Sequence, residues 1–263
     1  MESPMKAICL QDIRKRFMAQ PEKYLNLKKQ RGMTLLEIII VLGIIGTIAA
    51  GVVILAQRAF DSKALSDLTS NINTVRTSMK DAYGPTGIYP TAAGGLTAGL
   101  TDASTAAQFN ATPIGRLISL GKVSTSEAKN NVSNNYINAG GANIGTDGVR
   151  KAYFLEINGL NQAQCRNVLT QVGNSFDYVE VENGAGAGTY SIDATAPDLT
   201  TAPTNIDAPT GQTATDPGTP ATVTAATGIY RSLAQGGNYT LTPDGVIGAC
   251  SDDSTNDIIL GSR

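Results

Sequence analysis

The sequence of 263 residues contains no histidine and no tryptophan, and it has only three cysteines. Without histidine, a Ser-His or Cys-His catalytic pair and the usual histidine-containing zinc sites cannot form. The glycine-rich stretch 184–188 lacks the Gly-Lys-Ser/Thr ending of a phosphate-binding loop. The acids Asp216, Asp252, Asp253 and Asp257 do not follow the spacing of a calcium-binding loop. We therefore expect no enzyme, no cofactor and no metal site.

Basic residues are scarce outside the first 32 residues. Of 20 Lys and Arg and 22 Asp and Glu in the chain, residues 1–32 hold eight basic and three acidic side chains, a charge of +5, which leaves −7 for the rest. A basic segment in front of an apolar one stays on the cytoplasmic side of a membrane, so the acidic part is expected to be exported. An acidic body without a basic stripe also argues against nucleic acid as a partner.

Proline is absent from residues 33–83, and residues 35–56 carry a single charge, that of Glu37. Those 22 residues are otherwise apolar, and about 20 helical residues cover the roughly 30 Å of a bilayer core. The order of segments differs from that of a secretory signal peptide, where the small-residue cleavage site follows the apolar run. Here the small residue, Gly32, precedes it, so cleavage after Gly32 would keep the apolar segment on the product. An uncleaved signal anchor is the alternative, but it leaves Glu37 unexplained.

Glu37 has two possible roles. Thr34-Leu35-Leu36-Glu37 fits a capping box, with Thr34 as N-cap and Glu37 at position N3. A cap contributes about 1 kcal/mol, whereas a carboxylate at the centre of a membrane helix costs about 2.5–3.5 kcal/mol and less near the interface. Capping alone therefore does not clearly account for the acid. Its natural partner is the new amine that cleavage would create on Met33.

At these residues the sequence resembles the type IV pilins. In that family a prepilin peptidase cuts after the glycine, methylates the new N-terminal amine and leaves a glutamate fifth in the mature chain, which corresponds here to Gly32, Met33 and Glu37. A mature chain that begins with methionine, after a leader of about this length, resembles the type IVb subgroup of these pilins. Segments 55–62 (LAQRAFDS), 118–130 (ISLGKVSTSEAKN) and 158–173 (NGLNQAQCRNVLTQVG) resemble the toxin-coregulated, longus and colonization factor antigen III major pilins. We expect a member of the longus-like group.

The resemblance implies a major structural subunit of a type IVb pilus, held in the inner membrane as a prepilin and then polymerised into an extracellular filament for adherence or aggregation. It implies a prepilin peptidase, an assembly ATPase, an inner-membrane platform protein and an outer-membrane secretin as partners, besides other copies of the chain. A minor pilin or a type II secretion pseudopilin is the alternative in the same class. A signal-anchored periplasmic binding module is the alternative of another class.

The apolar helix is expected to continue to Tyr83. After Gln57 the apolar residues recur every three or four positions along one helical face: Leu65, Leu68, Ile72, Val75 and Met79. Residues 33–56 thus form the membrane or filament-core half, and residues 57–83 form an amphipathic half that packs on a domain. Gly84-Pro85 should end the helix. Any loosening during assembly is predicted at Gly43 to Gly51, where helix propensity is weakest.

The exported part indicates an α+β fold, in which the long N-terminal helix packs on a mainly antiparallel sheet. Residues 84–150 are expected to be a connecting region with one short helix, at 114–130, and residues 151–263 to hold the sheet. The expected elements of that region are strands at 151–158, 178–182, 188–193, 239–241 and 257–260, and a helix at 161–172. The second of these strands alternates strictly and should pair with the third across an Asn183-Gly184 turn.

The cysteines favour one disulfide. Cys9 lies in the basic leader, so removal of the leader leaves Cys165 and Cys250 in an oxidising compartment, with two unpaired thiols as the alternative. Between Ala194 and Gly228, 30 of 35 residues are Ala, Thr, Pro, Gly or Asp, a composition that cannot bury a core. This segment is expected to be a solvent-facing insertion. The receptor, the filament symmetry and any partner of the insertion do not follow from the sequence.

Overall fold

The computed structural model describes residues 34–91, 100–192, 195–203, 227–235, 241 and 243–263. The chain divides into two units, residues 1–56 and 57–263. Helix α2 (Leu35–Tyr83) runs through 49 residues, and the uninterrupted helix predicted from the absence of proline is confirmed over these residues. It is followed by the 3-10 turn η1 (Gly84–Thr86), which begins at the predicted Gly84-Pro85 stop and closes on Gly87 with φ 67°.

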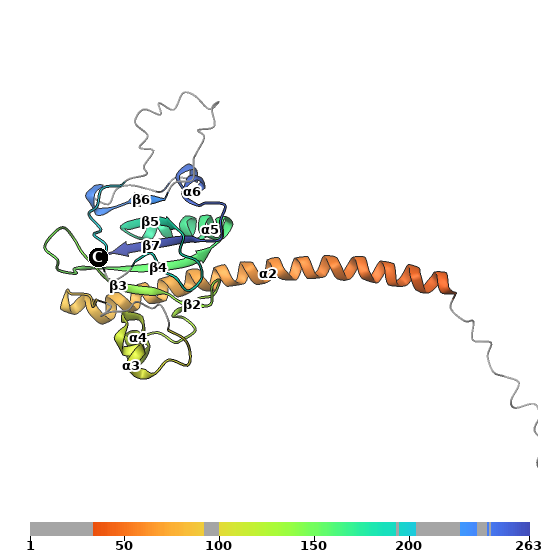
Figure 1. The fold of residues 1–263 in the computed structure, drawn as a ribbon, viewed down its shortest axis with the longest axis horizontal. Coiled ribbons are helices and arrows are strands. Elements are labelled where there is room, and N and C mark those ends of the chain that lie inside the picture. The colour runs from red at the N-terminus through yellow and green to blue at the C-terminus, as the bar shows by residue number, and fades with distance from the viewer. Residues whose placement is uncertain (1–33, 92–99, 193–194, 204–226, 236–240, 242) are drawn as a thin grey trace, which may run out of the picture. The chain divides into compact units, whose positions relative to one another are not determined.

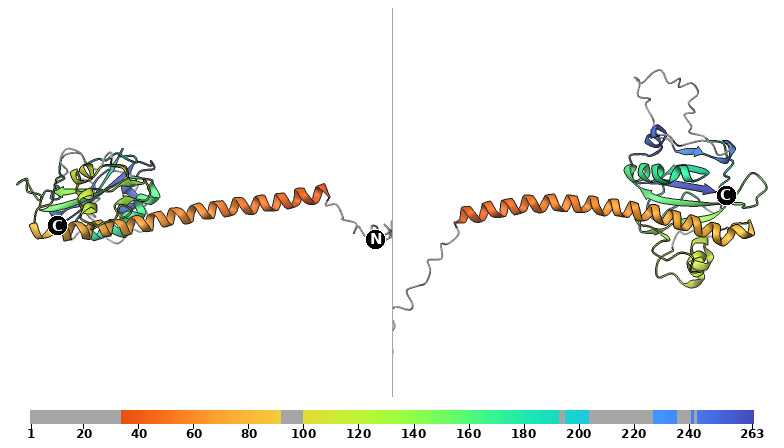
Figure 2. Two further views of the ribbon diagram at one scale, coloured as in Figure 1. Left: turned by 90° about the horizontal axis from the view of Figure 1, so that it is seen from below. Right: turned by 180° about the vertical axis from the view of Figure 1, so that it is seen from behind.

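The second half of α2 packs on the domain through the predicted face. Four of the five periodic side chains are completely buried, and Leu65 is partly buried: the buried ones are Leu68, Ile72, Val75 and Met79. Figures 1 and 2 show this half of the helix running alongside the sheet. Apolar residues spaced three to four apart form one stripe along the helix, and burial of this stripe holds an amphipathic helix against a sheet.

Residues 100–150 of the connecting region contain two short α-helices where one was predicted. Helix α3 (Ala106–Ala111) follows the N-cap Thr105, and helix α4 (Pro113–Ser119) follows the N-cap Thr112. The helix predicted over 114–130 is therefore wrong in its extent, because Gly121 adopts φ 68° and ends the helical path. The chain then forms a two-stranded ribbon from β1 (Lys129–Asn130) and β2 (Asn135–Tyr136).

Within the described residues the main sheet has five strands, all paired antiparallel in the order β3-β4-β7-β5-β6. These are β3 (Asn138–Ala142), β4 (Ala152–Leu160), β5 (Tyr178–Asn183), β6 (Gly228–Arg231) and β7 (Asn256–Ser262). The strands predicted at 151–158, 178–182 and 257–260 are confirmed as β4, β5 and β7. The predicted helix at 161–172 is confirmed as α5 (Gln162–Val172), which begins at a capping box on Asn161.

One predicted strand is wrong, and another lies mainly outside the described residues. Residues 188–192 do not pair with β5, whose neighbours are β6 and β7. They run instead across a face of the sheet, because the backbone N–H groups of Ser191 and Ile192 donate to the side chain of Glu156. The prediction at 239–241 falls mainly on residues outside the described ones, and the chain beyond it forms helix α6 (Pro243–Ala249).

The sheet is covered on both faces. Side chains that alternate along β4, β5 and β7 enter either the main cluster with α2 and α5, as Leu155, Val179 and Leu260 do, or a second cluster that contains Phe154 and Leu199. Leu199 is completely buried, so the expected solvent-facing insertion at 194–228 is wrong for residues 197–200. These residues are tied to Asn143 by backbone hydrogen bonds. Residues 204–226 lie outside the described part.

Candidate functional site

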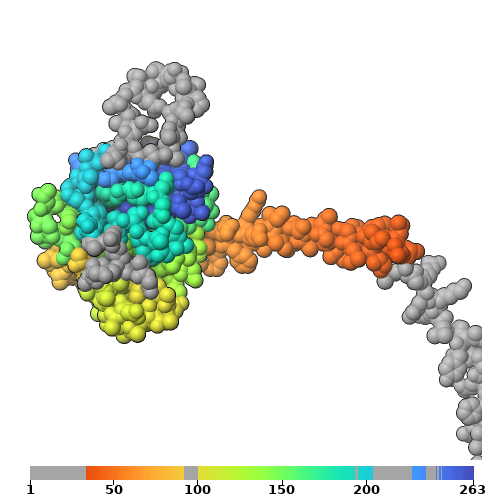
Figure 3. Space-filling model, viewed as in Figure 1, coloured from red at the N-terminus to blue at the C-terminus, as the bar shows by residue number. Residues whose placement is uncertain are grey.

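The first half of α2 presents apolar side chains on its whole surface. Its large side chains are all exposed, with Leu35 at 77% and Leu55 at 67% of their maximal area. Figure 3 shows these side chains as the surface of the red and orange helix. The helix has the length and composition to cross a membrane, with a mean hydropathy of 3.0 over its most apolar window and none of that window buried. Apolar surface of this extent is covered by lipid or by other apolar helices.

Glu37 lies in the first turn of this helix and is the single charged residue of the segment from 35 to 56. Its backbone N–H donates to Oγ1 of Thr34 at 3.3 Å and to the Thr34 carbonyl at 3.0 Å. The first contact is one of the two bonds of a capping box, so Thr34 is the N-cap. The Glu37 residue itself is exposed. Capping by Thr34 therefore leaves the Glu37 side chain accessible to a partner.

The predicted processing residues Gly32 and Met33 lie outside the described residues. Cleavage and methylation at this junction stay predictions. The predicted weak point, Gly43 to Gly51, is helical throughout, and a Cβ added at Gly43, Gly46 or Gly51 would meet nothing within 4 Å. These glycines therefore leave open surface for close helix contact, and their behaviour during assembly also stays a prediction.

The predicted disulfide is present between Cys165 in α5 and Cys250 after α6, with Cα atoms 6.0 Å apart and both residues completely buried. Two hydrogen bonds brace the same junction: Gln162 Nε2 donates to the Cys250 carbonyl at 3.2 Å, and Arg166 Nη2 donates to the Ile247 carbonyl at 2.9 Å. The bridge joins residues 85 positions apart. It thereby ties both ends of the chain segment that contains residues 195–203 and β6.

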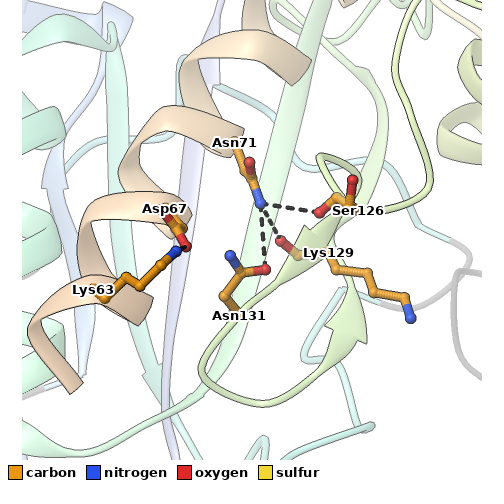
Figure 4. A network of polar contacts seen from close by, with 6 residues as sticks. All are labelled: Lys63, Asp67, Asn71, Ser126, Lys129 and Asn131. Atoms are coloured by element: carbon orange, nitrogen blue, oxygen red, sulfur yellow. Dashed lines mark hydrogen bonds and ion pairs between the residues drawn. The ribbon is translucent and has the colours of Figure 1, made fainter. Parts of the chain in front are cut away.

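A polar network holds the second half of α2 to the connecting region (Figure 4). The buried amide of Asn71 donates to the carbonyls of Lys129 at 2.9 Å and Ser126 at 3.2 Å, and lies 3.5 Å from Oδ1 of Asn131. An ion pair between Lys63 and Asp67 lies one turn away on the helix surface. Sequence reasoning missed Asn71, because an asparagine on a helix gives no signal of burial until its partners are known.

The sequence also did not predict that four carboxyl side chains lie together. Their positions in strand register place them on one face of the sheet: Glu156 in β4, Asp257 in β7, and Glu180 and Glu182 in β5. Asp257 was read from the sequence as one of several scattered acids. The antiparallel pairing of strands distant in sequence brings it beside Glu156.

Comparison with known proteins finds matches in two parts of the chain. Residues 27–53 match the prokaryotic N-terminal methylation motif, and residues 116–241 match the family model of the toxin-coregulated pilus subunit TcpA. A toxin coregulated pilin of Vibrio cholerae serotype O1 is 39% identical over 169 residues, covering 62% of this chain and 67% of the relative. A second toxin coregulated pilin of Vibrio cholerae is 40% identical, covering 59% and 63%.

The fold agrees with these relationships. The crystal structure of TcpA, a type IV pilin from Vibrio cholerae El Tor biotype, superimposes with a TM-score of 0.55 over 76% of this chain and 99% of that one, at 24% identity. The long helix, the antiparallel sheet and the Cys165–Cys250 disulfide together match the expected α+β pilin fold. The chain therefore belongs to the toxin-coregulated pilin family and is a major type IV pilin subunit.

Proposed function

We propose that Glu37 directs assembly by pairing with the N-terminal amine that cleavage between Gly32 and Met33 creates on a neighbouring subunit. The observation that carries the proposal is a single exposed carboxylate at the head of residues 35–56 of α2, which are otherwise uncharged and whose large apolar side chains are all exposed. When such helices pack together, the carboxylate enters a low-dielectric core and requires a cation. The Met33 amine is the positive group that processing generates there.

Pairing of this kind sets the axial register of the filament. An incoming subunit neutralises the carboxylate only at one offset along the helix, and a misplaced subunit leaves a buried charge without a partner. Thr34 supports the role by capping the first turn, which orients Glu37. The apolar half of α2 thus has two environments, the inner membrane before assembly and the filament core afterwards.

Processing and assembly of the subunit would require further protein partners. A prepilin peptidase would cut and methylate the chain at the inner membrane, and a platform protein, an assembly ATPase and an outer-membrane secretin would extrude the filament. The filament would lie outside the cell and serve adherence or aggregation. The basic leader and acidic remainder support this orientation, because positive residues stay on the cytoplasmic side.

The experiment compares Glu37→Ala with Thr34→Ala in cells that carry the cognate assembly system. Sheared surface filaments are quantified, and the N-terminal mass of membrane-held subunits reports cleavage and methylation. Glu37→Ala is expected to abolish filaments while subunits still begin at methylated Met33. Thr34→Ala removes only a cap, worth about 1 kcal/mol, and is expected to keep most of the filament yield. Normal filament yield from Glu37→Ala would refute the pairing role.

A further inference from the structure

Two carboxyl side chains meet on the sheet face that carries Leu199. Glu156 of β4 and Asp257 of β7 are both completely buried. Strands β4 and β7 are neighbours, and Glu156 stands opposite Ile259, so Asp257 lies two residues along β7 on the same face. Both side chains accept a hydrogen bond from the same backbone N–H, that of Ser191, so the two carboxyl groups are neighbours. Because two ionised carboxylates repel each other and can only accept hydrogen bonds, this buried pair is satisfied when one of the two carries a proton.

The donors around the pair indicate which one carries it. Glu156 accepts from Asn138 Nδ2 at 2.6 Å, from Ile192 N at 3.1 Å and from Ser191 N. Asp257 accepts from Ser191 N through Oδ2 at 3.3 Å, and its Oδ1 has no N–H or O–H donor among the described residues. A proton on Asp257 that is donated to Glu156 satisfies the pair with Glu156 as the anion.

The surroundings of the pair are acidic or neutral. Strand β5 adds Tyr178, Glu180 and Glu182 to this face, and the Tyr178 hydroxyl donates to Glu180 at 2.8 Å. Burial and the neighbouring Glu182 raise the pKa of Glu180. Tyr190 precedes Ser191 in the chain, and burial together with the negative charges of Glu156 and Asp257 raises the pKa of its hydroxyl. Strand β3 has no charged residue.

Arg231 of β6 donates to the carbonyl of Asn174. The largest influences on the pKa of Glu156 and Asp257 are burial, the other acid of the pair and the neighbouring hydrogen-bond donors. Burial raises the pKa of Glu156, and burial together with the adjacent Glu156 raises the pKa of Asp257 well above its usual range. The hydrogen bonds received by Glu156 oppose the shift on that side, which agrees with the proton residing on Asp257.

Residues 189–192, here termed the clasp segment, close over the pair. The segment has no regular secondary structure, and Thr189 and Ser191 are exposed. Its first half is held by Asn158 Nδ2 donating to the Thr189 carbonyl at 2.6 Å and by the Tyr190 hydroxyl donating to the Tyr136 carbonyl at 2.5 Å. Its second half is held by the N–H groups of Ser191 and Ile192, which donate to the acid pair. The acid pair therefore holds residues 191–192 in place. These residues in turn shield the acid pair from water.

We propose that Glu156 and Asp257 form a proton-operated clasp: one shared proton keeps residues 191–192 on the sheet, and loss of that proton releases them. Two adjacent buried anions repel each other and are stabilised by contact with water, so ionisation of both acids favours opening of the structure that covers them. The clasp segment is that cover, and it opens most easily because it is irregular and partly exposed. The clasp does not depend on the assembly role of Glu37, since the two lie in different units of the chain.

The test is amide hydrogen exchange of the full-length protein in detergent micelles between pH 5 and pH 8, corrected for intrinsic exchange. If opening releases one proton, the opening equilibrium of the Ser191 and Ile192 amides rises about tenfold per pH unit between the ordinary carboxyl pKa and the raised one. The rise stops once the closed pair has itself lost the proton. Constant protection across this range in the wild-type chain would overturn the proposal.

Two variants assign the effect. Asp257→Asn keeps a donor toward Glu156 but cannot ionise, so protection at 191–192 should become independent of pH. Glu156→Gln serves if the first variant fails to fold: Asp257 stays buried and titratable, but without the neighbouring acid its pKa is raised less, so the rise in opening should stop at a lower pH than in the wild-type chain. Asp253→Asn, an exposed change of the same chemistry, should retain the wild-type slope. The wild-type pH profile in Asp257→Asn or in Glu156→Gln would overturn the proton clasp. Protection restored at pH 8 by millimolar Ca²⁺ alone would overturn it in favour of a cation site.

Discussion

The side-chain amide of Asn71 donates a 2.9 Å hydrogen bond to the carbonyl of Lys129, which ties the packing half of α2 to β1. Asn71 is 7% exposed, and the same nitrogen also reaches Ser126. This contact lies between residues 58 positions apart in sequence. It gives the amphipathic helix a fixed position along its axis that apolar packing alone leaves adjustable, because apolar contacts are not directional.

Replacement of Asn71 should destabilise the domain. Asn71→Ala removes the donor from the part-buried carbonyl of Lys129 and one of two donors from that of Ser126, and a lost hydrogen bond costs about 0.5–1.5 kcal/mol. Urea unfolding measures the change. Asn73→Ala is the matched control, because the exposed Asn73 bonds only to the Thr69 carbonyl in its own helix. Equal unfolding midpoints for the two variants would contradict the role of Asn71.

Loss of the disulfide should lower stability by more than any single surface change. Removing a native disulfide from a small exported domain costs about 2–5 kcal/mol. Cys165→Ser and Cys250→Ser should each show this loss in urea unfolding under oxidising conditions, and the double variant should lose no more than about the same amount. Reduction of the wild-type protein is a second measurement, with the same expected shift. A wild-type midpoint that is insensitive to reduction would argue against the bridge as a stabilising element.

Leu199 tests the corrected view of the Ala194–Gly228 segment. Its side chain is completely buried, and Cδ2 would lie 2.7 Å from a Cβ added to Gly261 in β7. Leu199→Ala should therefore cost about 2–5 kcal/mol as a core truncation. Leu120→Ala, at a side chain that is 62% exposed, should change stability by less than about 0.5 kcal/mol. If both variants unfold at the wild-type midpoint, residues 197–200 do not cover the sheet in solution.

The contacts of Asp102 predict that the stability of the folded protein decreases at acidic pH. Hydrogen bonds from Lys129 and Tyr136, each 2.7 Å long, lower the pKa of the Asp102 carboxyl. A carboxyl whose pKa is lowered on folding stabilises the native state above its unfolded pKa, and this contribution disappears as pH falls through the folded value. Asp102→Asn should thus be less stable than wild type near pH 7, and the two should converge as the carboxyl is protonated. Urea midpoints as a function of pH measure this, with Asp253→Asn as the control for an exposed acid. A difference that is constant with pH would show that packing, and not charge, is responsible.

Several elements were predictable because their signals are local. The long helix follows from an apolar run without proline and from the 3,4 spacing after Gln57, and both the Gly84-Pro85 stop and the Asn161 cap are encoded within a few residues. Strands β4, β5 and β7 have the β-branched and alternating residues of sheet interiors. The junction around Gly32 and Glu37 identified the family because its order of charge, glycine, acid and apolar helix is unusual.

Other features depend on partners that are far away in sequence. Strand β3 (NAGGA) lacks β-branched residues and forms because β4 supplies its hydrogen bonds. Residues 188–192 look able to form a hairpin with β5, yet β6 occupies that edge and Glu156 captures their N–H groups. Leu199 is a single apolar residue in a polar stretch, and nothing nearby in the chain signals the cluster that receives it.

By itself the sequence determined the segments whose energetics are local: the basic leader, the apolar helix with Glu37 at its head, the amphipathic continuation and the two cysteines available for a bridge. Only the tertiary structure decided that the C-terminal strand β7 enters the centre of the sheet between β4 and β5, and that Glu156 therefore meets Asp257. The physical reason is that strand pairing and burial are satisfied between distant residues. Whether an acid is a solvated charge or a buried proton carrier depends on which strands become neighbours.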